Sequence, residues 1–327
     1  MKNKKILLLI IGVLLMIGLF TGCAAQQEEI TEGEIPEEVL DETEKRYPLE
    51  ITDGLGYDII IEAKPERIIS ISPSQTEILY ALGLGDRLVG VSDYCDYPEE
   101  ALTKEKVGSS WTVNVERIIE LMPDVVFTFG DSQPEAMQQI AAAGITVVRY
   151  VPESIDEIFE TMRSTGEITD TVAEAESVIA EMAEKRDAII NAVAGRETIR
   201  VFYQMWDEPL MTAGPSSFID ELIVLAGGEN IAGDAQGAYP QYSVEVMVEK
   251  DPEVFLAPAH MGDETDLTEE QEQELIKEIK SRPGYSEITA IKEDRVEVLE
   301  PNVVSRPGAR IIEAFEVIAK AVHPDLF

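Results

Sequence analysis

The feature that most limits the fold is a long stretch in the middle of the chain in which the alternation of strand and helix patterns is interrupted. Residues 169–193 contain no proline or glycine, and apolar side chains recur there at helical spacing. This stretch predicts one long helix, and because no heptad seam is sustained along it, a rigid strut is favoured over a coiled coil. On both sides of it, short β-rich runs alternate with amphipathic stretches. We therefore expect two α/β lobes joined by one long helix.

The alternating runs predict parallel sheets flanked by helices, that is, two Rossmann-like lobes. Lobe boundaries are expected at 47–167 and 196–327, with the helix over 168–195. Ligands of such sheets bind beyond the carboxyl ends of the strands, so the cleft between the lobes is the expected site. Strands are expected at 68–72, 87–91, 124–129, 145–151, 198–204, 254–258 and 296–299, and further helices at 73–84, 133–144, 216–226, 268–281 and 308–322.

The N-terminus has the pattern of an export signal. Three lysines fall within the first five residues, followed by an apolar run over 6–20 and by Thr21-Gly22 before Cys23. The run is shorter than the about 20 residues that a membrane span needs. We expect cleavage after residue 22 and acylation of Cys23, for example with palmitate, which would hold the protein at the extracytoplasmic face of the cell membrane. An ordinary signal peptide or an uncleaved anchor is the alternative.

Residues 23–46 are dominated by acidic side chains and are expected to form a disordered tether. The whole chain carries a formal charge of -38, which argues against nucleic-acid binding, because phosphate recognition needs a basic surface.

No catalytic arrangement is visible in the sequence. It contains no G-x-x-x-x-G-K-[ST], no G-x-S-x-G and no C-x-x-C, and Cys95 is the only cysteine besides Cys23. His260 and His323 are the only histidines and lack metal-ligand spacing, so we expect no protein-held metal. The sequence therefore predicts a binding protein that is not an enzyme and has no cofactor beyond the lipid.

A family resemblance is carried by four ordered stretches, residues 65–101, 107–127, 214–231 and 305–327. They resemble the helical-backbone, class III solute-binding proteins of ABC importers for cobalamin, ferric siderophores and haem. The resemblance implies two lobes that move little about the long helix, a monomer, and delivery of a metal chelate to a permease dimer with separate ATPase subunits.

The resemblance also implies that one glutamate on the surface of each lobe docks on arginines of the permease. Glu77 matches in the first lobe, and Glu221 is the closest match in the second, with Asp220 as the alternative. Both glutamates lie near the start of a predicted helix, where the helix dipole favours a carboxylate and where we expect it to face solvent.

Aromatic residues at predicted strand ends and in loops are the candidate ligand contacts, because a flat macrocycle or chelate needs broad apolar faces. Such positions are occupied by Trp111, Trp206, Tyr94 and Tyr97. The resemblance adds Tyr242, Asn302 and Arg306.

The choice of ligand depends on charge. Siderophores and haem are anionic and would favour several arginines in the cleft, for which Arg149, Arg306 and Arg310 are the candidates. A nearly neutral corrinoid needs fewer, and the segments around Tyr94 and Trp111 resemble cobalamin binders more closely. We therefore expect a corrinoid, with a ferric siderophore or haem as the alternative. An extracytoplasmic enzyme that processes metal chelates, or a ligand-sensing lipoprotein, would be a different class of function.

Overall fold

The computed structural model describes residues 46–109, 111–259 and 267–327. The chain divides into two compact units, residues 1–41 and 42–327, and all described residues belong to the second. Cys23, residues 24–45 of the predicted tether and His260 lie outside the described residues. Within the described residues no helix is both long and apolar enough to cross a membrane.

The N-terminal lobe is built on a parallel sheet with the strand order β4-β3-β5-β6. Its strands are β3 (Ile68–Ser70), β4 (Leu88–Val91), β5 (Val125–Phe129) and β6 (Thr146–Tyr150). An antiparallel hairpin of β1 (Leu49–Thr52) and β2 (Asp58–Ile61) precedes it. The helical segments are α1 (Pro73–Ala81), η2 (Gly85–Arg87), η3 (Glu99–Thr103), α2 (Val115–Glu120) and α3 (Pro134–Ala142).

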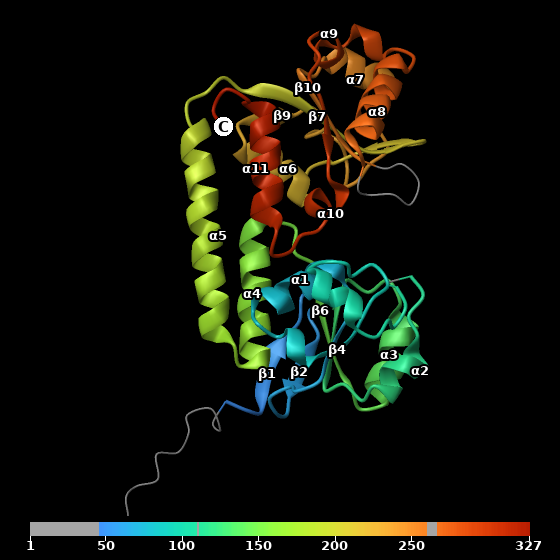
Figure 1. Ribbon diagram of the computed structural model, residues 1–327, viewed down its shortest axis with the longest axis vertical. Coiled ribbons are helices and arrows are strands. Elements are labelled where there is room, and N and C mark those ends of the chain that lie inside the picture. The colour runs from blue at the N-terminus through green and yellow to red at the C-terminus, as the bar shows by residue number, and fades with distance from the viewer. Residues whose placement is uncertain (1–45, 110, 260–266) are drawn as a thin grey trace, which may run out of the picture. The chain divides into compact units, whose positions relative to one another are not determined.

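Two antiparallel helices follow this lobe. Helix α4 (Ile155–Thr169) begins at a Ser154 N-cap and ends where Asp170 adopts the left-handed conformation with φ 58°. Helix α5 (Val172–Val193) then runs for 22 residues. Figure 1 shows α5 lying beside α4 over part of its length and beside α11 (Ile311–Val322) over the rest. The predicted long helix is therefore present, and it contacts helices from both sides of the molecule.

The C-terminal lobe repeats the architecture with the strand order β11-β10-β7-β8, and β9 pairs with β7. Its strands are β7 (Ile199–Asp207), β8 (Leu210–Thr212), β9 (Gly228–Asn230), β10 (Val254–Pro258) and β11 (Val296–Leu299), of which β8 alone pairs antiparallel among those described. The helical segments besides α11 are α6 (Phe218–Leu225), α7 (Val244–Lys250), α8 (Glu269–Ser281), η4 (Tyr285–Glu287), α9 (Thr289–Lys292) and α10 (Pro301–Val304).

Both sheets are covered on two faces, because each lobe contributes to more than one apolar cluster. The largest cluster joins residues of both lobes through α4, α5 and α11, and includes Phe127, Ile179 and Phe315. A second cluster, with Phe202 and Phe255, fills the far side of the C-terminal sheet. A third, with Ile69 and Ile118, does the same in the N-terminal lobe. This confirms the predicted α/β fold class with two parallel sheets.

The predicted pattern omits the β1-β2 hairpin, the short strands β8 and β9, and the helices α2, α4, α7, α9 and α10. Helix α4 does have a local signal, since Ser154 caps it and Ile155, Ile158 and Met162 are buried along one side. The short helices α2 and α7 leave only two turns or less of periodic pattern, which is too little to separate them from loop.

Candidate ligand-binding site

A cavity of about 620 Å³ lies between the two lobes. Its volume falls within the range of small-molecule sites, about 300–1,000 Å³. The lining comes from segments that follow strands of both sheets, as expected for open parallel sheets. The lining residues are Ser72, Pro73, Ser74, Trp111, Phe129, Ser132, Val151, Pro152, Glu153, Met205, Ser216, Phe218, Ala238, Tyr239, Ser305, Arg306 and Pro307.

Four exposed apolar side chains dominate the wall. Trp111 and Phe129 come from the N-terminal lobe, and Met205 and Tyr239 from the C-terminal lobe. Trp111 has 71% of its surface exposed, which is unusual for tryptophan unless a ligand or partner covers it. The arrangement can therefore hold a broad apolar ligand between faces of both lobes.

Sequence reasoning missed three of these four residues. Phe129 ends β5 and Met205 lies near the end of β7, so the rule that ligands bind at carboxyl ends of parallel strands points to both. Tyr239 lies in a loop with no comparable signal. Of the predicted ligand contacts, Trp111 and Arg306 line the cavity.

The other predicted aromatics lie elsewhere. Trp206 is exposed next to the lining residue Met205, but it does not line the cavity, because neighbouring residues of a strand point to opposite faces. The Tyr242 ring packs on Phe202 with 5.6 Å between centroids, and its hydroxyl donates to the carbonyl of Ile231 at 3.0 Å. The prediction of Tyr242 as a cleft residue is therefore wrong: it belongs to the apolar packing of the C-terminal lobe.

Tyr94 and Tyr97 lie in a loop that contacts the opposite lobe. The Tyr94 carbonyl accepts a hydrogen bond from Nη2 of Arg306 at 3.3 Å. The Tyr97 ring lies 4.0 Å from the guanidinium carbon of Arg310, a cation–π contact. Asn302 accepts a hydrogen bond from Arg306 at 2.7 Å through its side-chain oxygen. Tyr94 and Asn302 therefore contact Arg306, and Tyr97 contacts Arg310, but none of the three lines the cavity.

Contrary to the prediction, the Glu77 side chain does not face solvent. Its side chain is 1% exposed, and it accepts two hydrogen bonds from Arg310, at 3.0 and 2.7 Å, and one from Arg306 at 3.1 Å. The reason is tertiary: the start of α1 packs against the opposite lobe so closely that a Cβ atom at Gly308 would lie 2.9 Å from the Ser74 carbonyl oxygen.

Glu221 also has a role within the protein. Its Oε2 accepts a hydrogen bond from the backbone N–H of Ile155, the first residue of α4, at 2.8 Å. Burial raises the pKa of Glu221, and the hydrogen bond from Ile155 opposes that rise. The carboxylate is half-buried and satisfies a donor at a helix start. The alternative residue, Asp220, accepts a hydrogen bond from the Asn230 side chain at 2.7 Å.

The arginines that could hold an anionic ligand are already paired. Burial acts to lower the pKa of Arg306 and of Arg310, but hydrogen bonds to Asp96 and Glu77 outweigh it and raise both pKa values. Arg149 contacts Asp53 at 3.4 Å.

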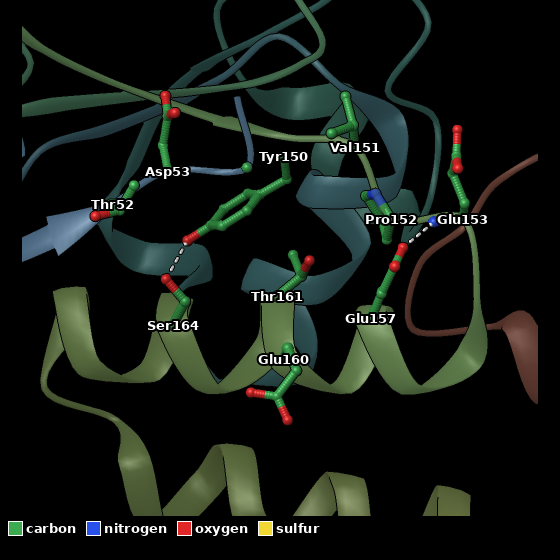
Figure 2. A pocket seen from close by; sticks show the side chains of 11 residues that line it. Thr52, Asp53, Tyr150, Val151, Pro152, Glu153, Glu157, Glu160, Thr161 and Ser164 are labelled. Carbon is green, nitrogen blue, oxygen red and sulfur yellow. Dashed lines mark hydrogen bonds between the residues drawn. The ribbon is translucent and has the colours of Figure 1, made fainter. Parts of the chain in front are cut away.

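A second cavity of about 520 Å³ borders the first and shares Val151, Pro152 and Glu153 with it. Figure 2 shows its polar wall, where the Tyr150 hydroxyl donates to Ser164 at 3.0 Å and Glu157 accepts from the backbone N–H of Glu153 at 2.7 Å. The lining residues that are charged at neutral pH all carry carboxylates, so the second cavity adds negative charge beside the interlobe cavity. They are Asp53, Glu153, Glu157 and Glu160.

Within the described ranges, no group of three or more histidine, cysteine, aspartate or glutamate side chains is placed to hold a metal ion.

Comparison with known proteins places this architecture in a family. Residues 68–303 match the family described as periplasmic binding protein. The chain is 32% identical over 289 residues to the uncharacterized ABC transporter substrate-binding lipoprotein YvrC of Bacillus subtilis, covering 86% of this chain and 87% of the relative. It is 30% identical over 260 residues to the vitamin B12-binding protein of Vibrio cholerae, covering 78% and 90%.

Solved structures agree with the fold. The vitamin B12 binding protein of Vibrio cholerae superposes with a TM-score of 0.68 at 29% identity, covering 79% of this chain and 96% of that one. A possible iron-binding protein of Staphylococcus epidermidis gives 0.69 at 29%, covering 80% and 99%. A haem-binding protein of Roseiflexus at 24% identity and TM-score 0.69, which covers 80% and 99%, shares the fold. With a matching family over most of its folded residues and the same two-lobed architecture, this chain belongs to the periplasmic binding protein family of ABC-importer solute-binding proteins.

Proposed function

We propose that this solute-binding protein captures a corrinoid between its lobes and delivers it to an ABC permease. The observation that carries the proposal is the cavity wall. It has four exposed apolar side chains, three of them aromatic, and its described lining includes a single arginine, already neutralised by carboxylates. Corrinoids carry neutral amide side chains around a large ring, so they need apolar contact and hydrogen bonds more than cationic partners. The vitamin B12-binding relatives support the same ligand.

Charge around the site argues against a strongly anionic ligand. Arg149, Arg306 and Arg310, the predicted anion partners, are each paired with a carboxylate of the protein. Glu153 lines the cavity and also the acidic second cavity. A tricatecholate siderophore or haem would have to displace one of these pairs, at a cost in binding free energy.

A lipid anchor at Cys23 completes the proposal for location. The signal pattern ends at this cysteine, and the similar Bacillus subtilis protein is named a lipoprotein. A tether of acidic residues between the anchor and the lobes would let the folded part reach a permease in the same membrane.

We infer that docking uses carboxylates other than Glu77 and Glu221, because both of these contact partners inside the protein. Glu116, in the first turn of α2, and Glu245, in the first turn of α7, are exposed. Helix α2 begins shortly after Trp111, and α7 begins shortly after Tyr239, so these carboxylates flank the same cavity from the two lobes. We infer that Glu116 and Glu245 contact arginines of the permease, where such pairs set orientation and association rate.

The ligand can be tested by calorimetry on mature protein with cyanocobalamin, a ferric siderophore and haem. We expect cyanocobalamin to bind with a Kd below about 1 µM and the two iron chelates to bind more weakly. Tight binding of the siderophore or of haem without binding of cyanocobalamin would overturn the corrinoid assignment.

The chain offers a matched pair of variants, because its two tryptophans are both exposed and only Trp111 lines the cavity. Trp111→Ala should weaken cyanocobalamin binding by about tenfold or more, as for a central aromatic contact, without unfolding the protein. Trp206→Ala should leave the affinity unchanged. Equal losses in both variants would place the ligand elsewhere.

A further inference from the structure

Four charged side chains form a neutral cluster beside the cavity, two from each lobe. Glu77 and Asp96 belong to the N-terminal lobe, and Arg306 and Arg310 to the C-terminal lobe. Asp96 contacts Arg306 at 2.6 and 3.1 Å through both of its oxygens, so the pair is bidentate. Two positive and two negative charges cancel within the cluster.

Both terminal nitrogens of Arg306 are engaged by protein acceptors. Nη1 donates to Glu77 at 3.1 Å and to Asp96 at 2.6 Å. Nη2 donates to Asp96, to Asn302 at 2.7 Å and to the Tyr94 carbonyl at 3.3 Å. A ligand carboxylate binds arginine best through two parallel hydrogen bonds. On Arg306, Asp96 already accepts this pair of hydrogen bonds from Nη1 and Nη2, the fork of the guanidinium.

The two carboxylates of the cluster differ in how firmly they are held. The Glu77 side chain is 1% exposed and bonds both arginines, so its removal would leave buried charge without a partner. The Asp96 side chain is 43% exposed, and its described ion pair is with Arg306. Asp96 is therefore the partner that can be changed without disturbing the core, and Arg306 is the cluster member that lines the cavity.

We propose that Asp96 determines the charge of ligand that this cavity accepts: by occupying the fork of Arg306, it makes the site select amide-bearing over carboxylate-bearing ligands. The inference rests on the proposed corrinoid site and names the residue that sets its selectivity. In Asp96→Asn, the carboxylate that fills this fork is lost and Glu77 alone is left to balance Arg306 and Arg310. A ligand carboxylate then gains a charge-assisted contact with Arg306.

The test compares two ligands that differ by one charge: cyanocobalamin and its monocarboxylic acid, in which one propionamide of the corrin ring is hydrolysed to a carboxylate. Wild type should prefer the amide form. Asp96→Asn should shift the ratio of the two Kd values toward the acid by about tenfold, the size expected for gaining one hydrogen bond to a charged group. Calorimetry measures both values on the mature protein.

Two controls separate selectivity from general charge. Asp96→Glu keeps the carboxylate and should restore the preference for the amide. Asp93→Asn removes an exposed negative charge from the same loop and should leave the ratio as in wild type. A ratio that is unchanged in Asp96→Asn, or that shifts equally in Asp93→Asn, would overturn the role of Asp96 while the corrinoid function stands.

Failure of the corrinoid proposal can be distinguished from failure of the proposed role of Asp96. If wild type binds neither corrinoid, the proposed ligand is wrong, and the same variants are compared on haem and haem dimethyl ester, which differ in their propionate charges. A shift toward haem in Asp96→Asn alone would support the role of Asp96 with that ligand. An unchanged ratio would overturn it.

Discussion

The structure gives the Glu77 carboxylate a different role from the one that its position in the sequence predicts. A glutamate near a helix start is favoured by the helix dipole and is commonly solvated. Here α1 meets the opposite lobe at Gly308, and Glu77 lies between Arg306 and Arg310 with almost no exposed surface. Its role is to neutralise two guanidiniums and to join the lobes.

Glu77→Gln should destabilise the protein strongly. The substitution keeps the shape but leaves two largely buried guanidiniums with one carboxylate fewer, and breaking a buried pair in this way costs about 3–5 kcal/mol. The free energy of unfolding from urea denaturation measures the loss.

Glu116→Gln is the matched control, because Glu116 is exposed in the first turn of α2. Its effect should stay within about 0.5 kcal/mol, as for ordinary surface substitutions. Similar stability of Glu77→Gln and wild type would mean that the buried pairs add nothing net to the fold.

At the scale of elements, the turn between α4 and α5 depends on Asp170. This residue adopts φ 58° and holds two cations, Arg46 at 2.7 Å and Lys64 at 3.2 Å. The hydrogen bond from Arg46, opposed by partial burial and reinforced by Lys64, lowers the pKa of Asp170 from its usual 3.8. The turn thus connects the helix pair to the N-terminal hairpin region.

This lowered pKa predicts a pH-dependent contribution to stability. Because the unfolded chain takes up the proton more readily than the folded one, the contribution is complete above about pH 3.8 and disappears as the pH falls through the lower folded pKa. Asp170→Asn keeps a residue that tolerates the left-handed conformation. It should therefore be less stable than wild type at neutral pH and should match it in strong acid.

Unfolding by urea at a series of pH values measures the difference between the two proteins. In an Arg46→Ala background the pH-dependent part of the stability difference should shrink, because the hydrogen bond that lowers the pKa of Asp170 most is gone. A difference that stays constant down to the lowest pH would show that the charge of Asp170 is not involved.

Elements with long local patterns were predictable, and short ones were not. The 22 residues of α5 carry enough turns of periodic sequence to identify it without tertiary information. Helices α2 and α7 have six and seven residues, and their Asn114 and Ser243 caps are visible only once the helix is known. The omission mattered, since the exposed carboxylates proposed for docking lie on these two helices.

For the molecule as a whole, the interlobe cavity is flanked by an exposed carboxylate from each lobe, Glu116 and Glu245. Reversing both charges, in Glu116→Arg with Glu245→Arg, should abolish transport and leave cyanocobalamin affinity unchanged, because neither residue lines the cavity. Uptake in cells or in vesicles containing the permease, beside calorimetry on the isolated variant, measures the two properties separately.

Glu120→Arg with Glu249→Arg serves as the control, since both residues are exposed on the same helices, away from the first turn. It has the same change in net charge and should retain uptake. Retained uptake in the Glu116 and Glu245 double variant would refute the docking surface.

The sequence by itself determined the fold class, the long helix and Trp111 as a residue at the cleft, because periodicity, caps and strand ends are local properties of the chain. Only the tertiary structure decided which charged side chains are paired within the protein. Glu77 meets Arg306 across 229 positions of sequence, and Asp96 meets it across 210, so no local pattern could reveal that these carboxylates neutralise the arginine at the cavity wall. The family resemblance likewise suggested Tyr242 as a cleft residue, whereas its packing on Phe202 places it in the apolar packing of the C-terminal lobe. Burial and charge compensation are set by residues far apart in sequence, and in this protein they decide what the cavity can bind.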